Sequence, residues 1–179
     1  MSDARVSLAR LQSSEHTLLT NLLELYVHDL SALFPQVELD DNGRFGYAKL
    51  PLFLGDSQRH LAFLVRAGDR IAGFALATRG SPVSDDPNVH DVAEFFVLRR
   101  YRRSGVGRHA AELLFQALPG RWTVRVLERN TRAFAFWRRA VFDFARGAVD
   151  EAERRDASGV WRVFAFDATD AQPERSALR

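Results

Sequence analysis

Apolar side chains recur with a helical period near the N-terminus. Leucine and tyrosine return every three or four positions between residues 18 and 30, which predicts an amphipathic helix. We expect this helix to end before Phe34 and Pro35. A short strand is expected at residues 6–11, and the turn-rich segment 37–58 is expected to form a loop or a short helix.

The middle of the chain has the pattern of strands. Apolar runs at residues 59–67 and 70–79 flank a Gly-Asp pair, and two runs around so short a turn predict an antiparallel hairpin. A third apolar strand is expected at residues 88–98.

The C-terminal part alternates between helix and strand patterns. The expected elements are a helix at 105–118, a strand at 121–128, a helix at 130–141 and a final hairpin of 143–151 with 159–167. Antiparallel strands followed by one strand-helix-strand crossover imply an α/β (α+β) fold, a mixed sheet with helices on its faces. Residues 1–179 are expected to form a single domain with a frayed tail from about Ala168.

Composition narrows the class of protein. Hydrophobic residues make up 46% of the chain and charged residues 27%, as in ordinary globular proteins. The N-terminus lacks the long apolar run of a signal peptide or membrane span, so a cytoplasmic location and no membrane partner are expected. A net charge of +2 is small for a nucleic-acid-binding domain, and no nucleic-acid partner is expected.

Cysteine and histidine usage excludes several chemistries. The chain has no cysteine, which excludes disulfides, thiolate metal ligands and a covalent thioester intermediate. Any acyl transfer would be direct unless a serine or threonine served as the carrier. The five histidines have no metal-binding spacing, so no metal site is predicted.

The stretch AEFFVLRRYRRSGVGRHAAELLF, residues 93–115, joins an apolar strand to a glycine-rich helix start through arginines. A helix start exposes N–H groups without internal partners, and the helix dipole adds about half a positive charge there. Gly105 and Gly107 lack a Cβ, so an anion such as a phosphate can approach the backbone closely. Charge-assisted hydrogen bonds could come from Arg102, Arg103 and Arg108.

Two other interpretations of this stretch remain open at this point. Residues 105–110 fit the dinucleotide fingerprint G-x-G-x-x-A, with Glu128 at a strand end roughly 20 residues later. That fingerprint, however, belongs to a doubly wound parallel sheet whose strand turns directly into the first glycine, and here residues 98–104 intervene. A solvated arginine turn explains the charges but leaves the paired glycines unexplained.

The segment VLRRYRRSGVGRHA resembles the acetyl-coenzyme A signature of the GNAT superfamily of N-acyltransferases. Arg102, Gly105 and Gly107 fill its central motif, Gln/Arg-x-x-Gly-x-Gly/Ala. The element order is similar to that of the family over residues 6–167. A second, looser motif of the family matches at Asn130, Ala133 and Phe136, and it departs at Trp137, where the family has tyrosine.

The resemblance implies a GNAT fold with acetyl-coenzyme A as co-substrate. The fold would have about six to seven strands in a mixed sheet, helices on both faces, and a V-shaped splay between the two central parallel strands. The main chain of Phe96 and Val97 would face the pantetheine arm, and Asn130 would bond it from the next strand. The residues expected around the pyrophosphate are Arg102 and those whose N–H groups would surround it, Arg103, Ser104, Gly105, Val106, Gly107 and Arg108.

Acetylating an amine requires a base, because a lysine-like amine has a pKa near 10.4 and must lose a proton. Glu94 is our candidate, since it is the only carboxylate in the apolar run VAEFFVL, where burial would raise its pKa. The alternative is an edge glutamate that pairs with an arginine or lies at the rim of the sheet. An indole cannot act as an acid, so the proton for the leaving thiolate would come from water or from a group of the N-terminal half. Three such groups are candidates: Tyr26, Tyr47 and His28.

These observations predict an N-acetyltransferase that moves an acetyl group from acetyl-coenzyme A directly to a primary amine of a small molecule or peptide. A non-catalytic acyl-coenzyme A-binding GNAT module is the alternative, and a nicotinamide-dependent reductase is a further one. The acceptor itself carries no readable motif. In a GNAT fold, its pocket is expected to be built by the first helical region, the loop 37–55 and the last hairpin. The apolar final strand, 160–166, could pair across a two-fold axis in a homodimer.

Overall fold

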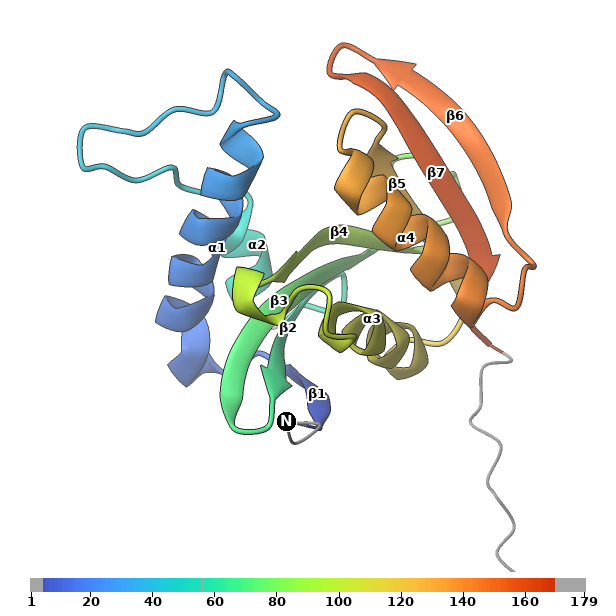
Figure 1. Ribbon diagram of the computed structural model, residues 1–179, viewed down its shortest axis with the longest axis horizontal. Coiled ribbons are helices and arrows are strands. Elements are labelled where there is room, and N and C mark those ends of the chain that lie inside the picture. Colours follow the sequence, from blue (N-terminus) through green and yellow to red (C-terminus); the bar gives the residue numbers. More distant parts are fainter. Residues whose placement is uncertain (1–4, 56, 170–179) are drawn as a thin grey trace, which may run out of the picture.

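The computed structural model describes residues 5–55 and 57–169, which form a seven-stranded mixed sheet in the order β1-β2-β3-β4-β5-β7-β6 (Figure 1). The strands are β1 (Val6–Arg10), β2 (His60–Ala67), β3 (Arg70–Arg79), β4 (His90–Val97), β5 (Arg121–Leu127), β6 (Asp150–Asp156) and β7 (Gly159–Asp167). The helices are α1 (His16–Ser31), α2 (Leu50–Leu54), α3 (Val106–Ala117) and α4 (Thr131–Phe144), with single 3₁₀ turns at Ser13–Glu15 and Arg99–Tyr101. The fold class expected from the sequence is confirmed.

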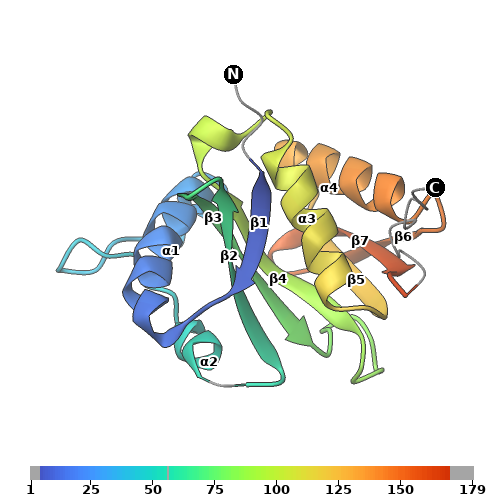
Figure 2. The same cartoon turned by 90° about the horizontal axis from the view of Figure 1, so that it is seen from below.

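Helices cover both faces of the sheet (Figure 2). On one face, α1 and α2 pack on the β2–β3 hairpin, with Leu19, Phe53 and Phe74 in one buried cluster. On the other face, α3 and α4 pack on β4, β5 and β7 around Phe115 and Trp122. The helical period of the sequence therefore produces two hydrophobic layers, one on each side of the strands.

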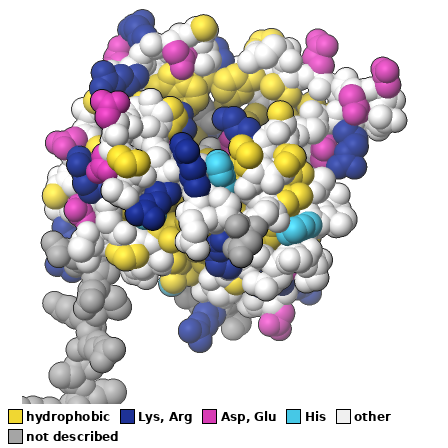
Figure 3. Space-filling view, turned by 180° about the vertical axis from the view of Figure 1, so that it is seen from behind, with side chains coloured by type: hydrophobic (Ala, Val, Ile, Leu, Met, Phe, Trp, Pro, Cys, Tyr) yellow, Lys and Arg dark blue, Asp and Glu magenta, His cyan; other side chains and the backbone are white. Residues whose placement is uncertain are grey.

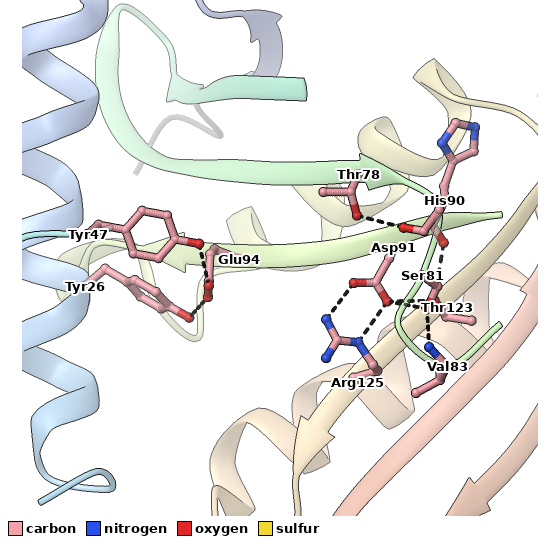
Figure 4. Close-up of polar contacts among 11 residues, drawn as sticks. Tyr26, Tyr47, Thr78, Ser81, Val83, His90, Asp91, Glu94, Thr123 and Arg125 are labelled. Atoms are coloured by element: carbon pink, nitrogen blue, oxygen red, sulfur yellow. Dashed lines mark hydrogen bonds and ion pairs between the residues drawn. The ribbon is translucent and has the colours of Figure 1, made fainter. Parts of the chain in front are cut away.

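A bulge in β4 decides which way the middle of this strand points. Leu76 of β3 pairs with Glu94, and the next residue, Ala77, pairs with Val92, so Ala93 is an extra residue. Val92 consequently packs in the α3–α4 layer, whereas Glu94 lies toward α1 and α2 (Figure 4). Without the extra residue, period-two alternation would place both side chains on the same face.

The two central parallel strands separate soon after they meet. β4 and β5 are paired only at His90 with Trp122 and at Asp91 with Thr123. Beyond these pairs, residues 92–97 of β4 have no strand on their β5 side, although β3 still pairs with β4 on the other side. The V-shaped splay expected between these strands is thus present.

The last hairpin differs from the sequence prediction. α4 continues to Phe144, and the strand expected at 143–151 is wrong because β6 spans Asp150–Asp156. β6 has almost only charged residues and is mostly exposed, so it lacks an apolar pattern and forms by pairing with β7. Since β7 lies between β5 and β6, both of its edges are occupied, and it offers no free edge for the pairing expected across a two-fold axis.

The first residue of the expected tail contacts the body of the protein. Ala168, directly after β7, is buried, and its N–H donates to the carbonyl of Gly120 at 2.8 Å. The rest of the predicted tail, 170–179, lies outside the described residues. Among the described helices, none has the length and hydrophobicity needed to cross a membrane.

Candidate functional site

A cavity of about 800 Å³ opens at the splay. Its walls come from α1, the segment before α2, the diverging ends of β4 and β5, the start of α4 and the β3–β4 loop. The face opposite to that of Figure 1 shows basic and histidine side chains among hydrophobic ones (Figure 3), and Lys49, Arg59 and His60 are cavity residues. The volume is typical of small-molecule sites.

Glu94 lies in the cavity wall and accepts hydrogen bonds from two tyrosine hydroxyl groups (Figure 4). Tyr26 of α1 donates to its Oε2, and Tyr47, just before α2, donates to its Oε1 at 2.8 Å. An ionised carboxylate has about four lone-pair sites, so each oxygen can still accept one further hydrogen bond. Glu94 is therefore held in place and remains able to receive a proton.

The surroundings of Glu94 favour its protonated form. Burial raises its pKa above the ordinary value, while the tyrosine hydrogen bonds and the charges of Lys49 and Arg125 act in the opposite direction. For both Tyr26 and Tyr47, burial and then the negative charge of Glu94 raise the pKa, so both hydroxyls stay protonated. The alternative of an edge glutamate paired with an arginine does not describe Glu94, whose hydrogen-bond partners are tyrosines.

A buried ion pair lies where the splay begins (Figure 4). Asp91 is 1% exposed, and it accepts from Arg125 of β5 at 3.0 Å and 2.8 Å. Thr123 and Ser81 also donate to its carboxylate, at 2.7 Å and 3.1 Å. Burial alone would lower the pKa of Arg125, but Asp91 outweighs it and raises this pKa. Sequence analysis missed this cluster, because its members lie on separate elements.

The backbone N–H groups of residues 103–108, here called the amide row, lead into α3. Within residues 5–55 and 57–169, no acceptor takes a hydrogen bond from any of them; the first such donor after the row is His109, to Gly105 at 3.0 Å. Arg103 and Gly105 have positive φ values of 65° and 85°, which turn the chain at the row. A row of free donors at a helix start suits an anion.

The two glycines differ in what they allow. A Cβ added at Gly105 would meet nothing within 4 Å, so the space beside it is open. A Cβ at Gly107 would lie 3.3 Å from Phe136 and 3.5 Å from Val97. Gly105 therefore leaves room for the expected anion, whereas a side chain at Gly107 would crowd Phe136, where α3 packs on α4.

The arginines near the amide row mostly have protein partners. Arg102 donates to Asp29 of α1 at 2.6 Å and to the carbonyl of Val97 at 2.7 Å, and Arg99 donates to Asp29 at 2.6 Å. Burial alone would raise the pKa of Asp29, but Arg102 and Arg99 hold it below the ordinary value. Arg108 lies 3.6 Å from Glu112, a long and exposed ion pair. Contact of Arg102 with a pyrophosphate stays a prediction.

The other expected site residues have the following places. The Oδ1 of Asn130 caps α4 by accepting from Ala133 at 3.2 Å, which leaves its amide nitrogen for a ligand in the cavity. Trp137 is 6% exposed and packs on Phe95, so it is part of the core. Of the three candidate proton donors, the tyrosines reach Glu94, whereas His28 packs edge-on against Phe45.

The fold is a mixed sheet whose central parallel strands splay apart, with a row of free N–H groups at the start of α3. The profile of the Acetyltransferase (GNAT) family matches residues 19–142, and the chain belongs to this family. No curated protein matches the sequence significantly.

Solved structures of acetyltransferases share the fold. One from Thermus thermophilus has 20% identity and a TM-score of 0.63, covering 93% of this chain and 99% of its own. The aminoglycoside acetyltransferase AAC(6')-Ib with coenzyme A has 12% identity and a TM-score of 0.66, with coverage of 91% and 95%. The ribosomal-protein-S18-alanine N-acetyltransferase of Escherichia coli has 17% identity and a TM-score of 0.56, with coverage of 95% and 98%.

Proposed function

We propose that the protein transfers an acetyl group from acetyl-coenzyme A directly to a primary amine of a small molecule or peptide. One observation carries this proposal: a single cavity reaches from Glu94 on the α1 side through the splay to Asn130 and Trp137 on the α4 side. The candidate base Glu94 and the splay, which could hold an extended ligand, therefore line the same cavity. The family membership and the mixed sheet favour this function over a nicotinamide-dependent reductase.

The donor half of the site would hold the coenzyme through backbone groups. The amide row, 103–108, would receive the pyrophosphate, because its N–H groups are free and Gly105 leaves open space beside them. The main chain of Phe96 and Val97, beyond the last β4–β5 pair, would face the pantetheine arm together with the amide nitrogen of Asn130. Acetyl-coenzyme A supplies the activated acyl group when bound.

The acceptor half would prepare the amine. An alkylammonium group has a pKa near 10.4, so it must give up a proton before or during attack on the carbonyl carbon. Glu94 would take this proton on one of its free lone pairs, directly or through water. The new bond joins the amine nitrogen to the acyl carbon, the carbon–sulfur bond breaks, and the sulfur leaves on coenzyme A.

The tyrosine pair is assigned to Glu94 and not to the leaving sulfur. Both hydroxyl groups already donate to the carboxylate, and donation to the charged form keeps the glutamate able to ionise despite its burial. Trp137 has an N–H that cannot act as an acid. Water is therefore the proposed proton source for the thiolate.

The test compares the parent protein with Glu94→Gln. We expect the parent to release free thiol from acetyl-coenzyme A with at least one member of an amine panel. Glu94→Gln should lower kcat about 100-fold or more, with coenzyme A affinity unchanged by titration calorimetry. Coenzyme A binding without thiol release would support the non-catalytic module. The replacement of the family tyrosine by Trp137 also favours that alternative. No coenzyme A binding, or binding of NADPH instead, would overturn the proposal.

A further inference from the structure

The segment between α1 and α2 carries Tyr47 to the site, yet most of it is exposed. Residues 38–44 are all exposed, and the chain projects away from the body here (Figure 1). Its tip is closed by Asp40, whose Oδ1 accepts from the N–H groups of Asn42 and Arg44, both at 2.9 Å. These hydrogen bonds stabilise the turn at the tip, but they do not connect the segment to the rest of the protein.

Glu24 of α1 provides that contact. Its Oε2 accepts from the N–H of Phe45 at 2.8 Å, and its Oε1 accepts from the N–H of Gly46 at 3.2 Å and from Nε of Arg44 at 3.3 Å. Gly46 has a φ of +66°, a left-handed conformation that glycine adopts at little cost. Successive N–H groups that converge in such a turn form an anion-binding nest, here filled by the side chain of Glu24.

We propose that Glu24 is a positioning residue that holds the hydroxyl of Tyr47 on Glu94. Tyr47 follows Gly46 directly, so the carboxylate of Glu24 fixes the backbone from which the tyrosine extends. The hydrogen bond from Tyr47 to Glu94 measures 2.8 Å, and a separation of about 3.6 Å would no longer be a hydrogen bond. A displacement of less than about 1 Å in the segment therefore breaks it.

Helix α1 thus positions both tyrosines that donate to Glu94. Tyr26 extends from α1 itself, and Glu24, two residues earlier, fastens the segment that carries the second tyrosine. The ring of Tyr47 also packs against the α1–α2 cluster, so Glu24 refines its position and does not bury it. This inference rests on the proposed role of Glu94 as base, and it adds a residue that does not touch the substrate.

The test measures the pKa of Glu94 in the full-length protein by carboxylate NMR, with Glu94→Gln used to assign the signal. Loss of a donor to the charged form raises a carboxyl pKa. We expect Glu24→Gln and Tyr47→Phe to raise the pKa of Glu94 by similar amounts. Removing the negative charge of Glu24 would by itself lower that pKa, so charge loss cannot imitate the result. The groups facing Glu94, namely Tyr26, Lys49 and Arg125, are unchanged in these variants.

A double-variant cycle decides whether Glu24 acts through Tyr47. In the Tyr47→Phe background, Glu24→Gln should cause no further rise, because the hydrogen bond it protects is already absent. A pKa of Glu94 that is unchanged or lowered in Glu24→Gln, or effects that add in the double variant, would overturn the proposal. Asp41→Asn, an exposed acid of the same segment, is the matched control and should leave the pKa unchanged.

Two further measurements keep the test decisive. If Glu24→Gln does not fold by circular dichroism, Gly46→Ala disturbs the same nest through its strained φ and should raise the pKa in the same direction. The NMR readout needs no turnover, so it stands even if no amine is acetylated. Where the proposed function also holds, Glu24→Gln should move the acidic limb of the pH profile of kcat to higher pH. Coenzyme A affinity should stay unchanged.

Discussion

At the scale of single residues, Glu94 links the stability of the protein to pH. Burial raises its folded-state pKa above the ordinary value of 4.5, so the folded state binds this proton more tightly than the unfolded state does. Its contribution to stability is fully present below the ordinary value and is lost as pH rises through the raised pKa. Glu94→Gln cannot titrate and should lack this loss.

The measurement is the free energy of unfolding in urea for both proteins from about pH 4 to about pH 8. The other carboxylates are common to both and cancel in the difference, so the parent should lose more stability than the variant as pH rises. Parallel curves would mean that Glu94 has the same pKa folded and unfolded, which would contradict its burial among the tyrosines.

At the scale of elements, the start of α3 separates ligand binding from packing. Gly105→Glu would place a negative charge in the open space beside the amide row, and we expect coenzyme A affinity to fall more than about tenfold, which is about 1.4 kcal/mol. Gly107→Glu is a poorer probe, because its side chain would collide with Phe136 and disturb the α3–α4 contact. Titration calorimetry gives the affinity.

Gly120 provides a matched control for this prediction. It also has a positive φ, +122°, and open space around it, but it lies at the opposite end of α3. Gly120→Glu should therefore cause at least as much backbone strain and the same charge change, with coenzyme A affinity close to that of the parent. Equal losses in both variants would show that strain, and not the amide row, determines binding.

Elements with an apolar period could be predicted from the sequence, and those without one could not. The β2–β3 hairpin and α3 were expected within about two residues, whereas β6 has no apolar pattern and is ordered only by pairing with β7. Glu94 stood out as a charge in an apolar run. Its tyrosine partners lie 68 and 47 residues away, so only the tertiary fold reveals which candidates reach it. Glu24 resembles any acid on a solvated helix face.

At the scale of the whole molecule, two halves of the sheet meet at a narrow joint. β4 and β5 share only two pairs, and the Asp91–Arg125 ion pair lies at this point. Removing one partner of a buried ion pair leaves the other without compensation, which costs about 3–5 kcal/mol. Because Arg125 is 24% exposed, we expect Asp91→Ala to cost about 3 kcal/mol in the free energy of unfolding.

The comparison that tests this joint uses a second variant and a surface control. Replacing both charges, as in Asp91→Ala with Arg125→Met, should recover part of the loss, because no unpaired buried charge remains. Glu153→Gln weakens an exposed pair with Arg155 and a long pair, 3.8 Å, with Arg162, and it should cost less than about 1 kcal/mol. Urea denaturation measures all three. A loss of stability in Asp91→Ala no larger than in Glu153→Gln would mean that the two residue pairs between β4 and β5 hold the halves together without the ion pair. The expected larger loss would instead mean that this ion pair contributes to holding the two halves of the sheet together.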